Sequence, residues 1–179
     1  MAELREITTS KKNRSLALIA GGAASLMAGG KITPVALMLA GAKGLEDEWR
    51  AANPEFRGSL KERFDLAIAH YDATHQHEIN RAMHTVGIPL ALGGFVGMLA
   101  SPRYTLPWWI ANGSWTAGWV LNFVGHGLFE KGEPAFATDP LGPIAGPVWD
   151  FVRLRDKIFG EAEDTAPADV PPPAATTRA

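Results

Sequence analysis

The sequence predicts an all-α protein: a compact helical integral membrane protein with about four short or broken membrane helices and additional interfacial amphipathic helices. Four apolar runs, residues 15–30, 35–42, 85–101 and 104–129, contain no Lys, Arg, Asp or Glu. Gly residues recur inside these runs, which is common in membrane helices and unfavourable in soluble ones. Amphipathic segments follow the apolar runs. A soluble all-α domain with buried helices is the alternative.

The composition limits the size and chemistry of the protein. With 179 residues, one domain is the natural expectation. The formal net charge of -2 gives no sign of a basic surface for nucleic acid. The absence of Cys excludes a disulfide scaffold, a zinc–thiolate site, an iron–sulfur cluster and a Cys nucleophile. A metal ion would therefore be held by His, carboxylates, amides or water.

Residues 1–56 form a basic segment followed by an apolar helical extension. The first 14 residues carry Arg5, Lys11, Lys12 and Arg14, which predicts a cytoplasmic N-terminus, in a bacterial inner membrane or a eukaryotic endoplasmic reticulum. The two apolar runs that follow are separated by Lys31 and Pro34. They predict one broken span or a helical hairpin that enters the bilayer, with a signal peptide as the alternative. Residues 43–56 are polar and end with a turn signal at Asn53-Pro54.

Residues 57–159 hold the remaining helices, and 160–179 form an acidic, Pro-rich tail that we expect to be disordered. An amphipathic helix starts at Ser59, with one stripe made of Leu60, Phe64, Ile68, Tyr71 and His75. The next run, 85–101, contains the small-residue pair Gly93 and Gly97. Residues 104–129 are long enough to span a membrane, with Trp108 and Trp109 at an interface. We expect 131–147 to be irregular and 148–159 to be a last amphipathic helix.

The histidines are the most informative residues, because four of the five lie within residues 70–84. On a continuous helix, His77, Asn80 and His84 would share a face. A break near residues 76–78 would instead allow His75 and His84 to converge.

The fifth histidine, His126, lies inside the longest apolar run and four residues before Glu130. This spacing places both side chains on one helix face. They could be metal ligands, a ligand with its partner, or a structural hydrogen bond.

These residues fall into two spaced blocks. The first consists of Tyr71, His75, Asn80, His84 and Pro89, separated by three, four, three and four residues. The second consists of Trp119, Asn122, Gly125-His126, Glu130 and Pro134-Ala135. Over residues 57–159 this pattern resembles the small membrane family of the fungal 2-hydroxy fatty acid dioxygenase. The chain departs from the family pattern in three places. Glu78 stands where the family often has Pro, and Asn122 stands where it usually has Gln. The apolar segment 15–42 is an addition to the short form of the family.

The resemblance implies an Fe(II)-dependent dioxygenase that uses O2 without 2-oxoglutarate and shortens 2-hydroxy fatty acids by one carbon. It places metal ligands at His75, His84, His126 and Glu130, with His77 as a weaker candidate. Asn80, Glu130 and Arg81 are the catalytic candidates, and Arg81 could pair with the substrate carboxylate.

The expected partners are a 2-hydroxy fatty acid or similar acyl substrate, O2 and membrane lipids, and a homo-oligomer is left open. The alternative function is a non-catalytic helical membrane protein that binds a metal or a lipid. A purely structural helical membrane protein is a third hypothesis.

Overall fold

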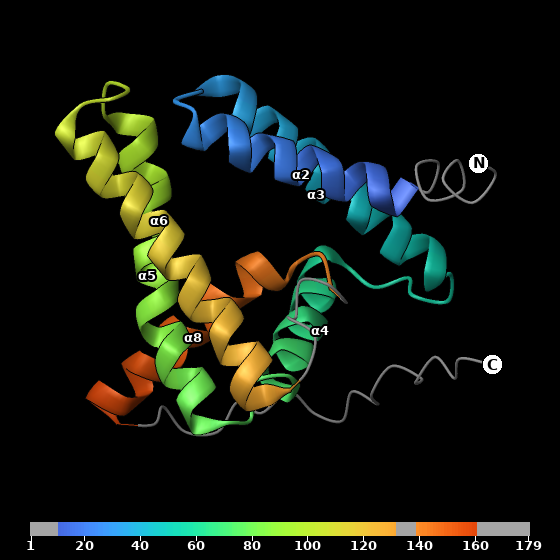
Figure 1. Cartoon of the computed structure of the whole chain (residues 1–179). Helices are drawn as coiled ribbons and strands as arrows, with labels where there is room; N and C mark the ends of the chain where they lie inside the picture. Colours follow the sequence, from blue (N-terminus) through green and yellow to red (C-terminus); the bar gives the residue numbers. More distant parts are fainter. Residues whose placement is uncertain (1–10, 132–138, 161–179) are drawn as a thin grey trace.

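The computed structural model describes residues 11–131 and 139–160, and this part of the chain is helical with no strand. It contains six α-helices and one π-helical turn (Figure 1). Their bounds are α2 Lys11–Met27, α3 Ile32–Ala52, α4 Leu60–Ala73, α5 Glu78–Ala100, α6 Leu106–Val124, η1 Gly125–Glu130 and α8 Gly142–Phe159. The predicted all-α class is therefore confirmed, whereas the expected tail at 160–179 lies, except for Gly160, outside the described residues.

The long helices pair into two hairpins, α2–α3 and α5–α6, whose members lie side by side in Figure 1. Of the two arrangements expected for the N-terminal segment, the structure has the helical hairpin. Glycines allow the close approach in both pairs. A Cβ on Gly41 would overlap the backbone of α2, and one on Gly94 would overlap the backbone of Ala111 and Trp115.

The two hairpins meet at their turns (Figure 1). Leu26 packs with Met98, Trp108 and Ala111 in a buried apolar cluster. The Lys31 ammonium donates to the carbonyl oxygens of Met98 and Ser101, which end α5. Of the two tryptophans expected at a membrane interface, Trp108 is buried in this cluster and Trp109 is exposed.

The polar residues 43–52 continue α3 up to the Asn53-Pro54 signal. Opposite charges four residues apart stabilise this part of the helix. Lys43 pairs with Asp47 at 2.6 Å and Arg50 pairs with Glu46 at 2.8 Å. The turn expected at Asn53 is confirmed, since α3 ends at Ala52.

Helix α4 begins with a capping box in which Ser59 and Glu62 each accept a hydrogen bond from the other's backbone N–H. Its buried face is centred on Arg63, Ala67 and Tyr71, and Leu60 is 75% exposed. The predicted stripe is therefore confirmed at Tyr71 and His75, which are buried, and wrong at Leu60, because Arg63 and Ala67 occupy the inner face of the first turns.

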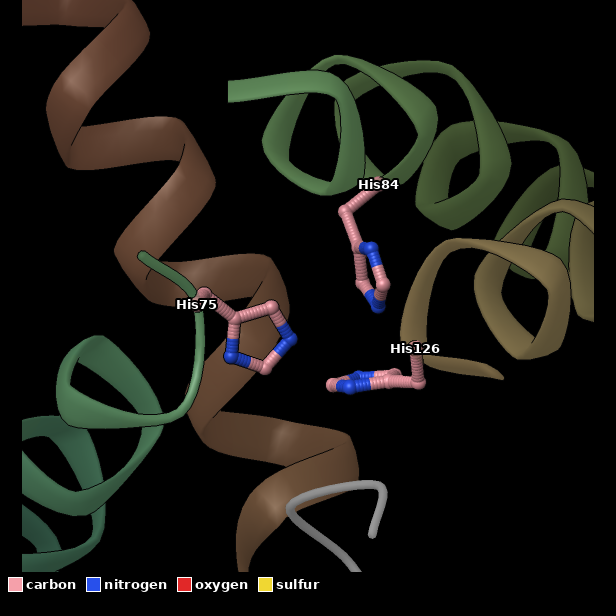
Figure 2. A group of neighbouring side chains, drawn as sticks. All are labelled: His75, His84 and His126. Carbon is pink, nitrogen blue, oxygen red and sulfur yellow. The ribbon is translucent and has the colours of Figure 1, made fainter. Parts of the chain in front are cut away.

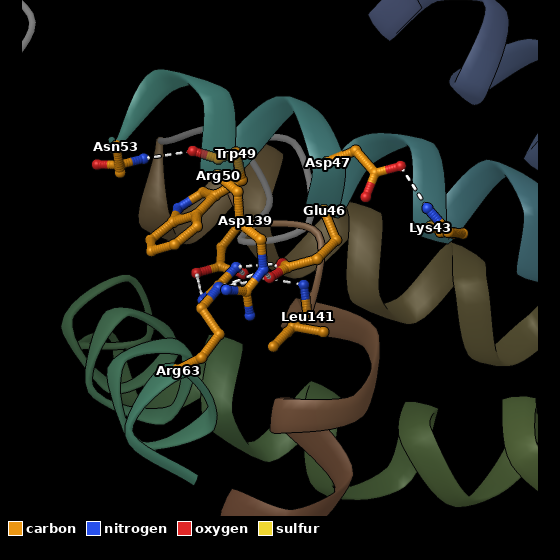
Figure 3. Close-up of polar contacts among 9 residues, drawn as sticks. All are labelled: Lys43, Glu46, Asp47, Trp49, Arg50, Asn53, Arg63, Asp139 and Leu141. Atoms are coloured by element: carbon orange, nitrogen blue, oxygen red, sulfur yellow. Dashed lines mark hydrogen bonds and ion pairs between the residues drawn. The ribbon is translucent and has the colours of Figure 1, made fainter. Parts of the chain in front are cut away.

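The Arg63 guanidinium is fully buried and joins three segments that are distant in sequence (Figure 3). Two of its nitrogens donate to Asp139 at 2.8 and 3.0 Å, and it donates to Glu46 of α3 at 3.0 Å. Its carbon Cζ lies 3.6 Å from the ring centroid of Trp49. Two carboxylates and an aromatic face compensate the loss of water around this charge.

Helix α8 begins at Gly142, so the expectation of irregular structure is wrong for residues 142–147. Pro143 lies in the first helical turn, where the missing N–H costs nothing. The helix packs on α4 through Ala145 and Trp149, which contact Ala67 and Tyr71. This contact brings α8 beside the segment that follows α4.

Among the helices that the structure describes, α5 is the one long and apolar enough to cross a membrane. Its 23 residues correspond to about 34 Å, slightly more than the apolar thickness of a bilayer. Helix α6 has 19 residues and includes Asn112 and Asn122. The arrangement with about four membrane helices stays a prediction.

Candidate metal centre

The helical structure is interrupted between His75 and His84, the two histidines of the first sequence block. Helix α4 ends at Ala73 and α5 begins at Glu78. His77 caps α5, since its Nδ1 accepts a hydrogen bond from the N–H of Ile79 at 3.2 Å. The interpretation with a break near residues 76–78 is therefore confirmed, and the continuous helix is wrong.

Three imidazoles converge next to this break (Figure 2). His75 comes from the turn after α4, His84 from α5 and His126 from η1. The ring centroids of His75 lie 4.6 Å from those of His84 and His126, which are 4.9 Å apart. One nitrogen from each ring lies within 4.8 Å of the other two, and all three side chains are buried. Three buried nitrogens at this spacing can bind one metal ion.

Backbone carbonyls fix the proton on two of these rings. His75 Nδ1 donates to the Tyr71 carbonyl at 2.7 Å, and His84 Nδ1 donates to the Asn80 carbonyl at 2.9 Å. Because a carbonyl only accepts, the lone pair of each ring is left on Nε2. His75 Nε2 and His126 Nδ1 are buried without a partner among the described residues. Such unsatisfied nitrogens are the atoms that a metal ion would satisfy.

The His75 ring is enclosed by aromatic side chains. Tyr71 stacks on it with centroids 3.7 Å apart, and Trp149 of α8 lies 6.2 Å away. Burial and the neighbouring His84 lower the pKa of His75 to about 3, while its hydrogen bond to the Tyr71 carbonyl opposes the shift. The imidazole is therefore neutral near pH 7, as a metal ligand must be. Trp149 was not a candidate in the sequence, although it lies in the expected last amphipathic helix.

His126 lies in a π-helical turn, a form that is rare and frequent at functional sites. The turn starts at Gly125, where a Cβ would overlap the Asn80 side-chain oxygen. Only glycine therefore lets η1 approach α5 this closely. The motif residues Pro134 and Ala135 lie outside the described part of the chain.

Glu130 faces the same turn but is not in the three-histidine group. Its carboxylate accepts hydrogen bonds from the N–H of Gln76 at 2.7 Å, the N–H of His77 at 3.0 Å and the Asn80 amide at 3.2 Å. Burial raises the pKa of Glu130, but these three hydrogen bonds outweigh burial and hold the pKa below its usual range.

Asn80 and Arg81 lie on either side of the turn that carries His75. Asn80 is fully buried between Glu130 and Gly125. The Arg81 Nε donates to the His75 carbonyl, and its Cζ lies 5.8 Å from the Trp149 ring centroid. His77 is exposed and packs on Phe129 at 5.4 Å. The structure thus separates His77 from the three converging imidazoles.

An open pocket of about 350 Å³ lies beside this turn. It is lined by Gln76, His77, Phe129 and Glu130. Three of these residues are linked, because Glu130 accepts from the N–H groups of Gln76 and His77, and Asn80 also donates to Glu130. The pocket therefore lies at the solvent side of the residues that hold the site together.

Comparison with known proteins assigns the chain to a family. The model of one family, described as 2-hydroxy-palmitic acid dioxygenase Mpo1-like, matches residues 61–158. The match covers more than half of the chain and includes all three converging histidines. No curated protein and no solved structure matches the chain. By this match, the chain belongs to the 2-hydroxy-palmitic acid dioxygenase Mpo1-like family.

Proposed function

We propose that the protein is a membrane-embedded, Fe(II)-dependent dioxygenase that shortens 2-hydroxy fatty acids by one carbon. The observation that carries the proposal is the convergence of three buried imidazoles in a member of this family. When bound, ferrous iron would supply coordination positions for O2 and for the hydroxyl and carboxylate oxygens of the substrate.

The three histidines would hold the metal ion without a change of protonation. The Tyr71 and Asn80 carbonyls keep the proton of His75 and His84 on Nδ1. Imidazole ligands suit iron, zinc, copper and nickel, so the donor set fits Fe(II) without selecting it alone. The family description, with its dioxygenase activity, favours iron.

Arg81 is the residue that we propose for the substrate carboxylate. Its Nε holds the His75 carbonyl, which keeps the guanidinium beside the metal centre. Its two terminal nitrogens have no hydrogen-bond partner among the described residues, so they are free to donate to a carboxylate. An arginine can bind both carboxylate oxygens at once, which would orient the bond between the first two carbons.

The acyl chain would lie among apolar helices in the bilayer. Large exposed apolar side chains cover α5 and α6, including Val86, Leu92, Val96, Ile110, Val120 and Phe123. Exposed apolar surface of this extent is typical of contact with lipid or with another protein. A bilayer location would deliver an insoluble acyl substrate to the site by lateral diffusion.

The decisive experiment measures metal and activity on the same preparations. The full chain is purified in detergent without oxygen, and its metal content is determined by mass spectrometry. We expect about one iron per chain in the wild type and in the control His70→Ala. We expect its loss in His84→Ala and in His126→Ala, with helical content preserved. O2 consumption should then depend on 2-hydroxypalmitate and be absent with palmitate, which lacks the hydroxyl.

The other outcomes separate the alternatives. Iron retained together with activity in both His variants would refute the metal centre. A site that holds metal but consumes no O2 with any 2-hydroxy acid would favour a non-catalytic metal-binding protein. Zinc in place of iron would keep the site and point to hydrolysis.

A further inference from the structure

We propose that Glu130 is a positioning residue and not itself a metal ligand. Its hydrogen bonds connect the three segments that carry His75, His84 and His126, and so fix the spacing of these histidines. This inference rests on the proposed metal centre. It assigns a specific role to the one acidic residue that the sequence motifs place beside the histidines.

The Glu130 carboxylate is occupied by donors from a distant part of the chain. One oxygen accepts from the N–H of Gln76, and the other accepts from the N–H of His77 and from the Asn80 amide. The partners lie 50 to 54 residues before Glu130 in sequence. A charged acceptor with three N–H donors forms strong, charge-assisted hydrogen bonds. Three of the roughly four lone-pair sites of the carboxylate are thus used within the protein, and Glu130 is not in the group of side chains close enough to share one ion.

Each of these contacts is adjacent to one of the histidines. Gln76 and His77 directly follow His75 along the chain. Asn80 lies one helical turn before His84, and its carbonyl accepts the proton of His84 Nδ1. Glu130 itself lies at the end of the π-helical turn that carries His126. One carboxylate therefore connects all three elements that supply an imidazole.

A close contact on the other side of Asn80 restricts the geometry further. Gly125 approaches the Asn80 oxygen so closely that no side chain would fit between them. Asn80 is thus held between the start of η1 at Gly125 and its end at Glu130. Loss of the Glu130 contacts would free the turn at residues 74–77 while the α5–α6 packing stays in place.

The test compares Glu130→Gln with Glu78→Gln, which neutralises an exposed carboxylate on the first turn of α5. A glutamine offers one acceptor oxygen, and its NH2 group would face an N–H donor. Hydrogen exchange of the metal-free full chain in detergent reports on the backbone N–H groups of Gln76 and His77. Titration with Co(II) measures the affinity, and the visible spectrum of the saturated protein reports on the ligand set.

We expect faster exchange at Gln76 and His77 in Glu130→Gln, and a Co(II) affinity reduced about 10- to 100-fold, as for other partners of metal ligands. The spectrum at saturation should equal that of the wild type, because the three imidazoles are unchanged. Glu78→Gln should match the wild type in all three measurements. Asn80→Ala, which removes one of the three donors to Glu130, should also reduce the Co(II) affinity, but by a smaller factor. If Glu130→Gln does not fold, Asn80→Ala is the variant that tests the inference.

Two results would overturn the inference. A changed Co(II) spectrum at saturation would make Glu130 a ligand. Unchanged exchange and affinity in Glu130→Gln, or unchanged affinity in Asn80→Ala, would remove its positioning role. If the wild type binds neither Co(II) nor Fe(II), or binds them without needing His84, the proposed metal centre fails as well. That failure is visible in the wild type and in His84→Ala, independently of Glu130.

Discussion

The contacts of the buried Arg63 side chain allow us to predict how much stability the protein loses when this side chain is replaced. In Arg63→Met, the Asp139 side chain, 6% exposed, loses both guanidinium hydrogen bonds and, within the described part of the chain, keeps only the N–H of Leu141. Glu46 keeps its pair with Arg50. The cost is therefore that of one buried charge without its partner, about 3 to 5 kcal/mol. For a chain of this size, that is a fall in Tm of roughly 6 to 20 °C.

The assay is thermal and denaturant unfolding of the full chain in detergent, followed by circular dichroism. Lys61→Met is the control on the same helix, because its pair with Asp65 is exposed and screened by solvent, so its loss should barely change the stability. The double variant Arg63→Met/Asp139→Asn removes both charges and should recover most of the loss. A single variant as mild as Lys61→Met, or no recovery in the double variant, would refute the reasoning.

Two further predictions concern packing and pH. Gly94→Ala should destabilise the protein by about 1 to 3 kcal/mol, because the added Cβ overlaps the Trp115 backbone. Gly93 has open space around it, so Gly93→Ala should be neutral or slightly stabilising in the same unfolding assay. Equal effects of Gly93→Ala and Gly94→Ala on stability would contradict the close packing of α5 on α6. Burial raises the pKa of Asp150 from 3.8 to about 6, although Arg153 lowers it. The folded pKa exceeds the unfolded one, so the contribution of Asp150 to stability falls as the pH rises from about 4 to 6, while the lowered pKa of His75 acts in the opposite direction. Asp150→Asn should lack the Asp150 contribution, so its stability relative to the wild type should rise over this pH range, and parallel stability curves for the two proteins would contradict this.

Local signals in the sequence correctly predicted the start of α4 and the turn after α3. Ser59 and Glu62 have the spacing of a capping box, and Asn53-Pro54 marks the end of α3. The break between His75 and His84 was one of two interpretations, because periodicity alone fits a continuous helix as well as two helices. The cap at His77, which decides between them, depends on a side-chain contact that sequence spacing does not encode.

The long-range polar contacts could not be predicted from the sequence. Arg63 is buried because carboxylates at residues 46 and 139 meet it, and neither lies near it in the chain. Glu130 was singled out together with His126 as a candidate pair by the spacing in the sequence. Its hydrogen bonds to the backbone after His75 depend on how α5 and η1 approach each other. The sequence analysis missed the early start of α8 because residues 131–147 are rich in Pro and Gly, although Pro143 fits the first helical turn and the helix also includes Pro147.

The π-helical turn at Gly125–Glu130 has a consequence for how this segment tolerates changes in length. Gly127 and Leu128 are exposed, and such positions usually accept insertions and deletions easily. Here, however, a π turn holds about one residue more than an α turn, and each α-helical residue advances the chain direction by about 100°. An inserted residue would therefore turn Glu130 by about 100° away from residues 76–80, whereas a deletion that rewinds the segment as a regular α-helix would nearly keep its direction. The register of this single turn, more than the identity of its exposed residues, is therefore what natural variation must preserve.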